Sequence, residues 1–482
     1  MENLNGATGA SNNANDQHIR IVDANNSLLR EWKSRTAATG MEYLRSSAGF
    51  HLDRDEHALR RHFGVVVGVG KKKRQKKKKS PASQGGMGNR KGVFAKDYER
   101  PRLDAFNQHC DSVVTKYNLD QLHVEGIVTS IEPVEDHVKV VVSCPLPNNI
   151  DTDDGSNHAH DIETKSRISR TYTAQNVVLA LGNDEPSYPE WVDEEDIARE
   201  IVRHLLDDRR PTKLSHNITS VDADTDEDTD HVEVKDVAVI GGGITAAHKV
   251  LELVRTARTH STRDNTKRHI DNTIHLISRH PLKEQQFDTH QDWMMDRATC
   301  RRSEEVGGVG TPDCQETFRS CNCWEERRRI IARERIPGTV TPAIHRGEGG
   351  LSYAIDNGNV EWHHAEVLKK RYVGVAGQRK RIELSLSCGN TIEVDEVLLA
   401  TGFGKKLPGG KLIKDLIEKY SLEVSDFCGF PIVDENLSWR GSSQRIYVTG
   451  ALAELELGPS ARNIAGARLA AERILQAAAV NV

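Results

Sequence analysis

The sequence predicts an α/β protein built around parallel sheets and divided into two or three domains. Short apolar runs rich in β-branched residues alternate with helical patterns along most of the chain, as in folds with crossover helices. Two of these runs, at 236–240 and 445–448, lead within two residues to a glycine and then to a helical stretch. The length of 482 residues exceeds what one compact domain usually holds.

Composition excludes several classes of protein. With 37% hydrophobic residues, a mean hydropathy of −0.58 and no long apolar run, the chain is expected to be soluble, without a membrane-spanning helix. Its polar start has no secretory pattern, so we expect a cytoplasmic protein with reduced cysteines. The net charge is −5 despite the basic run Lys71 to Lys79, so the rest of the chain is acidic and nucleic-acid binding is not expected.

Several segments have the composition of insertions or linkers. Residues 1–17 are expected to be disordered, and 64–92 form a low-complexity basic insertion, for which a nuclear-localisation signal is the alternative interpretation. Residues 146–166 predict a long loop between two hairpin strands. The range 191–229 is expected to be a linker, because the acidic stretch 220–234 begins there and leads to a strong strand signal.

The strongest functional signal is a glycine turn between the strand at 236–240 and the helix that follows. Gly241, Gly243 and Ala246 fit the pattern G-x-G-x-x-A. The first position permits the tight turn, the second lets the backbone approach a pyrophosphate, and the third keeps helix and strand close. Unpaired N–H groups at the helix start would bind phosphate oxygens, so the turn predicts a dinucleotide site.

The next strand, at 273–279, indicates which dinucleotide binds. It ends in Ser278 and Arg279 and not in an acidic residue. An acidic side chain there would bind a ribose 2′-hydroxyl, whereas a guanidinium suits a 2′-phosphate. The sequence therefore favours NADPH over NADH.

Further strand ends lie where a dinucleotide would be expected, because backbone at the carboxyl ends of parallel strands lines the binding crevice. The strand at 177–181 leads to Gly182, and the stretch 382–404 is expected to form two strands joined at Gly389-Asn390. The remaining positions of this kind are Leu181, Thr401, Gly402, Gly450 and Ala451, together with Pro459, Ser460 and Asn463, which open an alanine-rich final helix.

Taken in order, ALGNDEP, VAVIGGGITAAH, LLATG and IYVTGALAELELGPSARNIAGARLAAERI resemble the flavoprotein monooxygenases with two dinucleotide-binding domains. Within these, the chain is similar to the L-ornithine and L-lysine N-hydroxylase group. Residues 22–63 resemble the stretch that follows the second strand of the FAD domain, and 287–294, 324–331 and 338–345 also resemble segments of that group.

The resemblance implies two Rossmann-like domains. A discontinuous FAD domain would comprise 18–190 and 385–482, with an NADPH domain at 230–384 inserted. NADPH would pass a hydride to FAD, and a flavin C4a-hydroperoxide would then oxygenate a small amine or amino acid using dioxygen. The FAD-binding positions implied in the first segment are Asp23, Trp32, Leu44 and Arg45.

One departure from the family concerns the start of the FAD domain. The family begins with a strand and a G-x-G-x-x-G turn, and nothing before His18 supplies them, so the first strand is expected to be missing. Either the chain start is misplaced and an N-terminal stretch is lacking, or tight flavin binding has been lost. The alternatives to a monooxygenase are an NADPH oxidase or reductase that does not oxygenate an amine, and a non-catalytic nucleotide-binding relative.

Candidates for catalysis are few. The resemblance implies that Arg45 and His51 face the flavin, and that the N–H groups after Pro459 lie near its pyrimidine oxygen. Cys300, Cys314, Cys321 and Cys323 lack the usual C-x₂₋₄-C spacing of zinc sites, so free thiols and no metal are expected. The absence of C-x-x-C and C-x₄-C also speaks against a disulfide reductase.

Overall fold

The computed structural model describes residues 19–65, 92–146, 167–183, 185–207, 236–263, 273–290, 293–294, 314–374, 381–443 and 445–480. The helices of this part are α1 (Arg30–Ala38), α2 (Ala58–His62), α3 (Leu103–Lys116), α4 (Glu194–Ala198), α5 (Ile244–Arg263), α7 (Cys314–Ser320), α8 (Trp324–Glu334), α9 (Pro342–Arg346), α10 (Leu351–Asp356), α11 (Gly410–Tyr420), α12 (Glu454–Leu457) and α13 (Ile464–Val480).

The strands of the described residues are β1 (Ile21–Asp23), β2 (His123–Glu125), β3 (Ile127–Pro133), β4 (Val138–Pro145), β5 (Arg167–Ala174), β6 (Val177–Leu179), β7 (Val202–His204), β8 (Val237–Ile240), β9 (Ile274–Ser278), β10 (Lys283–Glu284), β11 (Thr339–Val340), β12 (Glu361–His364), β13 (Val367–Val373), β14 (Arg381–Leu386), β15 (Thr391–Val394), β16 (Glu396–Leu399) and β17 (Ile446–Val448).

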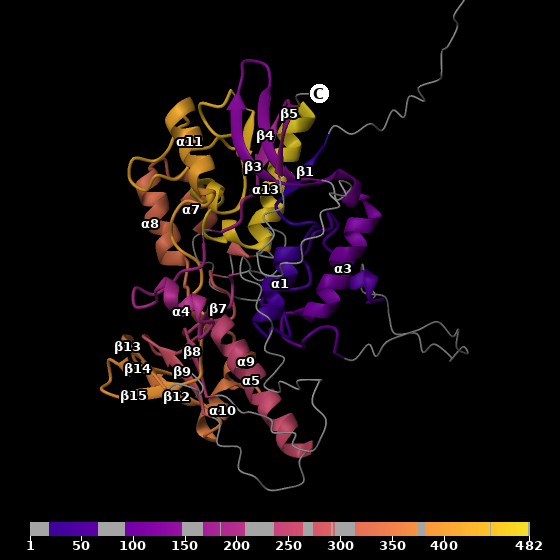
Figure 1. The fold of residues 1–482 in the computed structure, drawn as a ribbon. Coiled ribbons are helices and arrows are strands. Elements are labelled where there is room, and N and C mark those ends of the chain that lie inside the picture. The colour runs from indigo at the N-terminus through magenta and orange to yellow at the C-terminus, as the bar shows by residue number, and fades with distance from the viewer. Residues whose placement is uncertain are drawn as a thin grey trace, which may run out of the picture.

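A five-stranded parallel sheet organises the lower part of the molecule in Figure 1, with strand order β12-β9-β8-β16-β7. Side chains alternate between its two faces. Val237 and Val239 of β8 pack with Val250 of α5, whereas Ala238 packs with Ile382 of β14 on the other face. The sheet is therefore a middle layer between helices and the antiparallel sheet β13-β14-β15, which confirms the expected α/β class.

The upper part of Figure 1 holds the antiparallel sheet β3-β4-β5 and the helices α11 and α13. Two separate parallel pairs of this part are β1 with β2 and β6 with β17. Val22 of β1 packs into the same core as Leu179 of β6 and Val448 of β17. No strand of the described residues joins the two pairs, and the expected loss of a first strand falls on residues 1–18, which lie outside them.

The structure confirms some expected elements and divides others. β4 and β5 pair in antiparallel register, so the hairpin expected around 146–166 is present. The stretch 382–404 forms three strands where two were expected. The hairpin β14-β15 turns at Gly389, and after Asp395 the chain enters β16 of the parallel sheet.

The range 191–229, expected to be a linker, contains regular structure in its described part. Asp193 and Asp196 form a capping box at the start of α4. β7 follows and pairs in parallel with β16 at the end of the five-stranded sheet. The acidic stretch 220–234 and the basic run Lys71 to Lys79 lie outside the described residues.

Candidate functional site

The carboxyl ends of β8, β9 and β16 form the first candidate site, which we call the glycine-turn site. Gly241 follows β8 with a φ of +148°, and its N–H donates a hydrogen bond to the Ile277 carbonyl at 2.9 Å. A Cβ at Gly241 would lie 2.4 Å from the carbonyl oxygen of Ala400, which follows β16. Because no side chain fits so close to backbone, the turn requires glycine here.

The next positions of the motif bring the backbone of two segments together. A Cβ at Gly243 would lie 3.3 Å from the Cα of Gly338, and Ala246 is buried against the sheet. α5 begins at Ile244, so the amide groups of its first turn lie at this same edge. The first turn of this long helix, which only glycine backbone approaches, is suited to bind an anionic diphosphate.

The end of β9 supplies a cation beside the turn. Ser278 accepts a hydrogen bond from Trp362 Nε1 at 2.9 Å and donates one to the His280 carbonyl at 3.0 Å. Arg279 is exposed and forms no ion pair with an acidic side chain of the described residues. Its guanidinium is therefore available to an anionic ligand.

The carboxyl ends of β6 and β17 form a second strand-end site. Gly182 and Gly450 both have positive φ, +72° and +60°. The Thr449 N–H donates to the Leu179 carbonyl at 3.0 Å, which extends the pairing of the two strands to their ends. Leu181 is exposed beside this edge. The two glycines thus leave bare backbone where a second dinucleotide would lie.

The segments after β6 and β16 run side by side, so two strand ends that are far apart in sequence meet. Ser187 N–H donates to the Gly402 carbonyl at 2.9 Å, and Gly404 N–H donates to the Glu185 carbonyl at 2.8 Å. The Thr401 hydroxyl also donates to the Ser187 carbonyl at 2.5 Å. These bonds connect the second strand-end site to the glycine-turn site.

Of the expected FAD-binding residues near the start, three have contacts within their own segment. Asp23 ends β1, and its Oδ1 accepts a hydrogen bond from the Asn25 N–H at 2.7 Å. Trp32 Nε1 donates to Asn107 at 2.9 Å, and Leu44 is buried. The bond from Trp32 to Asn107 holds α1 against α3.

Arg45 crosses from this segment to the part of the chain that carries the glycine turn. Its guanidinium donates to the carbonyls of Gln286 and Gln285 at 2.7 and 2.9 Å and to the Thr339 hydroxyl at 2.7 Å. Burial lowers the pKa of Arg45, and Asp288 partly offsets that effect. Arg45 is thus a bridge between two parts of the chain, with its donors committed to protein acceptors.

His51 lies in the interior of the protein. Its ring packs edge-on against His109 with centroids 4.8 Å apart, and its Nε2 lies 3.2 Å from the Glu56 carbonyl. Burial lowers the pKa of His51 to about 4, so the ring is neutral at pH 7. Arg468 of α13 donates to the His51 carbonyl at 2.8 Å and fixes this loop.

The C-terminal positions open α13 as expected. Pro459 to Arg462 form a turn of 3-10 helix, and Asn463 Oδ1 accepts a hydrogen bond from the Gly466 N–H at 3.1 Å. This is an N-cap, in which the side chain satisfies one of the free amide groups of the first turn. Ala451 and Ser460 are buried.

A buried cluster of charges near this segment was not expected from the sequence. Glu454 of α12 is 2% exposed and pairs with Arg328 of α8 and with Arg462, the latter at 2.6 Å. The neighbouring Glu456 accepts from Arg327 at 2.5 Å. The cluster binds α8 to the start of the final helix.

The cysteines and the hydropathy of the helices were also subjects of expectations from the sequence. Cys321 and Cys323 are free thiols, whereas Cys300 lies outside the described residues. No helix in the part of the chain that the structure describes is both long enough and apolar enough to cross a membrane.

Comparison with known proteins places this architecture. No family model and no curated protein matches the sequence. Among solved structures, an ornithine hydroxylase from Pseudomonas aeruginosa matches with a TM-score of 0.50 and 16% identity, over 79% of this chain and 76% of that one. A cadaverine monooxygenase of desferrioxamine biosynthesis from Erwinia amylovora, solved with FAD, matches with a TM-score of 0.55 and 13% identity, over 95% of this chain and 87% of that one. The chain therefore has the α/β fold of these two monooxygenases, as its sequence motifs predicted.

Proposed function

We propose that the chain is an oxidoreductase that binds NADPH at the glycine-turn site and FAD at the second strand-end site. The observation that carries this proposal is the contact between Gly241 and the Ala400 carbonyl, which leaves backbone and no side chain at the start of α5. The two solved structures reported above are an ornithine hydroxylase and a cadaverine monooxygenase, and the second was solved with FAD.

In this proposal the dinucleotide that donates hydride is NADPH. Gly241, Gly243 and Ala246 would hold its diphosphate at the start of α5, and Ser278 would lie beside the ribose. Arg279 would bind the 2′-phosphate, since its exposed guanidinium has no acidic partner in the described residues. The protein's part is to orient the nicotinamide toward the second site.

FAD, which accepts hydride and activates dioxygen when bound, would lie along the second strand-end site. The residues proposed to hold it are Asp23, Trp32, Leu44, Arg45, Leu181, Gly182, Thr401, Gly402, Gly450, Ala451, Pro459 and Asn463. Arg45 would act from its bridge to Thr339, by positioning the segment 22–63 against the part that binds NADPH. The hydrogen bonds at 185–187 and 402–404 would hold the two nucleotide sites in a constant relation.

We further propose that the substrate oxygenated is a small amine. Both matched monooxygenases are named for amine-bearing substrates, ornithine and cadaverine. Arg45 and His51 stay the candidate flavin-facing residues. Their proposed role is positioning, because Arg45 donates to protein carbonyls and His51 is buried and neutral.

The test uses the purified 482-residue chain with added FAD. Its absorbance spectrum should show bound flavin, and anaerobic NADPH should bleach the flavin bands. If flavin binds and NADPH leaves it oxidised, the assignment of the glycine-turn site is wrong. If no flavin binds, the proposed FAD site is wrong for this chain.

A single substitution tests the cofactor preference. Arg279→Gln should raise the Kd for NADPH about 10- to 100-fold, the loss expected for a hydrogen bond between charged groups, and leave NADH binding unchanged. His280→Gln, at the next exposed position, is the matched control. Equal effects of Arg279→Gln on both nucleotides would contradict the role of this residue.

A further inference from the structure

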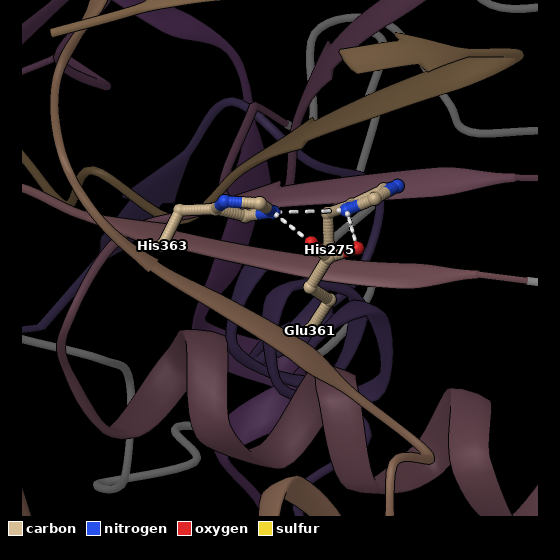
Figure 2. Close-up of side chains that lie close together, drawn as sticks. All are labelled: His275, Glu361 and His363. Atoms are coloured by element: carbon tan, nitrogen blue, oxygen red, sulfur yellow. Dashed lines mark hydrogen bonds and ion pairs between the residues drawn. The ribbon is translucent and has the colours of Figure 1, made fainter. Parts of the chain in front are cut away.

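Two histidines and a glutamate meet on the five-stranded sheet at a place that neither nucleotide site uses (Figure 2). His275 lies on β9, and Glu361 and His363 lie on the neighbouring edge strand β12. Glu361 is directly opposite His275 in the parallel register. Because side chains alternate along a strand, His363 points to the same face as Glu361, and all three converge.

The distances between the three side chains match those between ligands of one metal ion. His275 Nδ1 lies 3.0 Å from His363 Nε2 and 3.4 Å from Glu361 Oε2. His363 Nε2 lies 3.7 Å from Glu361 Oε1. Ligand atoms placed tetrahedrally around Zn²⁺ with bonds of 2.0 to 2.1 Å are about 3.3 Å apart. The observed separations lie around that value, with the two distances to Glu361 running to different carboxylate oxygens, and one ligand atom from each residue lies within 4.8 Å of the others.

The surroundings favour metal binding in a second respect. His275 and His363 are 7% and 5% exposed, whereas Glu361 is open to solvent. A cavity adjoins the cluster and is lined also by residues 390–393 around the start of β15, which leaves room for a water molecule as a fourth ligand.

We propose that His275, Glu361 and His363 bind one Zn²⁺ ion. Two imidazoles and a carboxylate suit Zn²⁺, whereas Mg²⁺ and Ca²⁺ prefer oxygen ligands alone. His275 stands three residues before Ser278, which places the ion about 10 Å along β9 from the glycine-turn site. The ion would fasten the edge strand β12 to β9, and it takes no part in hydride transfer.

The experiment measures zinc on the full-length chain without added nucleotide or flavin. The protein is stripped with a chelator, dialysed, and titrated with Zn²⁺, and bound metal per chain is determined by elemental analysis. Wild type should bind one Zn²⁺ per chain. Glu361→Gln and His363→Gln should each raise the Kd for Zn²⁺ at least 10-fold. His364→Gln is the matched control, because His364 is exposed and its side chain alternates to the other face of β12.

Thermal unfolding provides a second readout and separates binding from misfolding. Zn²⁺ should raise the Tm of wild type and of His364→Gln, and should leave the Tm of Glu361→Gln unchanged. Glu361 is exposed, so Glu361→Gln should have the same Tm without zinc as wild type. This variant therefore tests the proposal even if His363→Gln does not fold. The proposal is wrong if wild type binds no zinc, or if Glu361→Gln and His364→Gln bind it equally well.

Discussion

Replacing Glu454 with glutamine should strongly destabilise the region where α8 meets the start of α13. The Glu454 carboxylate is buried and paired with Arg328 and Arg462. Burial acts to raise the pKa of this carboxyl, but the hydrogen bond from Arg462 and the charges of both arginines outweigh burial and lower it. The folded state therefore holds Glu454 as a carboxylate.

The expected cost follows from the burial of the partners. Removing one member of a buried ion pair costs about 3–5 kcal/mol, and glutamine keeps one acceptor oxygen, so we expect about 3 kcal/mol. With a urea m-value of about 2 kcal/mol/M, the unfolding midpoint should fall by about 1.5 M. Fluorescence can follow the transition, because Trp293 and Trp324 belong to the apolar cluster that contains Leu455, the neighbour of Glu454.

Glu418→Gln is the control for this prediction. Glu418 is 61% exposed and pairs with Lys414 at 3.7 Å, so its loss should cost at most about 0.5 kcal/mol. Because the pKa of Glu454 is lowered on folding, its contribution is present above the unfolded pKa and is lost as pH falls through the folded pKa. Wild type and Glu454→Gln should therefore converge in stability at acid pH. Equal midpoints for the two variants at pH 7 would refute the reasoning.

Three further outcomes are expected. Gly241→Ala should weaken NADPH binding at least 10-fold, because the added Cβ would lie 2.4 Å from a carbonyl oxygen; a titration that gives an affinity within twofold of wild type would contradict this. Burial lowers the pKa values of His51 and His109 to about 4, so stability should fall as pH drops from 6.5 to 4, by up to about 3 kcal/mol for each histidine, in urea unfolding followed across that range. Iodoacetamide should label the exposed Cys388 in the folded protein and spare Cys110, which is buried and whose pKa burial raises to about 12. Peptide mass spectrometry should show Cys388 labelled before and after unfolding, and Cys110 labelled only after it.

Local features were predictable from the sequence because their causes are local. The glycine turn at Gly241 needs only a strand before it and a helix after it, and both are written in adjacent residues. The hairpin of β4 and β5 was predictable for the same reason, as was the start of the final helix near Asn463. The break between β15 and β16 at Asp395 was not predictable, because the Asp395 carboxylate accepts a hydrogen bond from the Asp236 N–H, 159 residues away.

Features built from distant residues could not be read from sequence. Arg328 and Glu454 are 126 residues apart, and nothing near either one indicates the other. His275 and His363 are 88 residues apart and meet only because β9 and β12 pair in a particular register. In the same way, the sequence contains Gly241 but does not show that the Ala400 carbonyl lies close enough to make glycine necessary there.

The order in which the chain is synthesised gives β16 and β17 a consequence for folding. β16 lies between β7 and β8 in the five-stranded sheet, and β17 pairs with β6. Neither the five-stranded sheet nor the pair β6-β17 can therefore be completed before the last hundred residues are synthesised. At about 5–20 residues per second, a ribosome needs roughly 8–32 s to pass from the end of β8 to the end of β16. During that interval the edges of β7 and β8 that later pair with β16 have no strand between them, so the sheet closes only after β16 emerges.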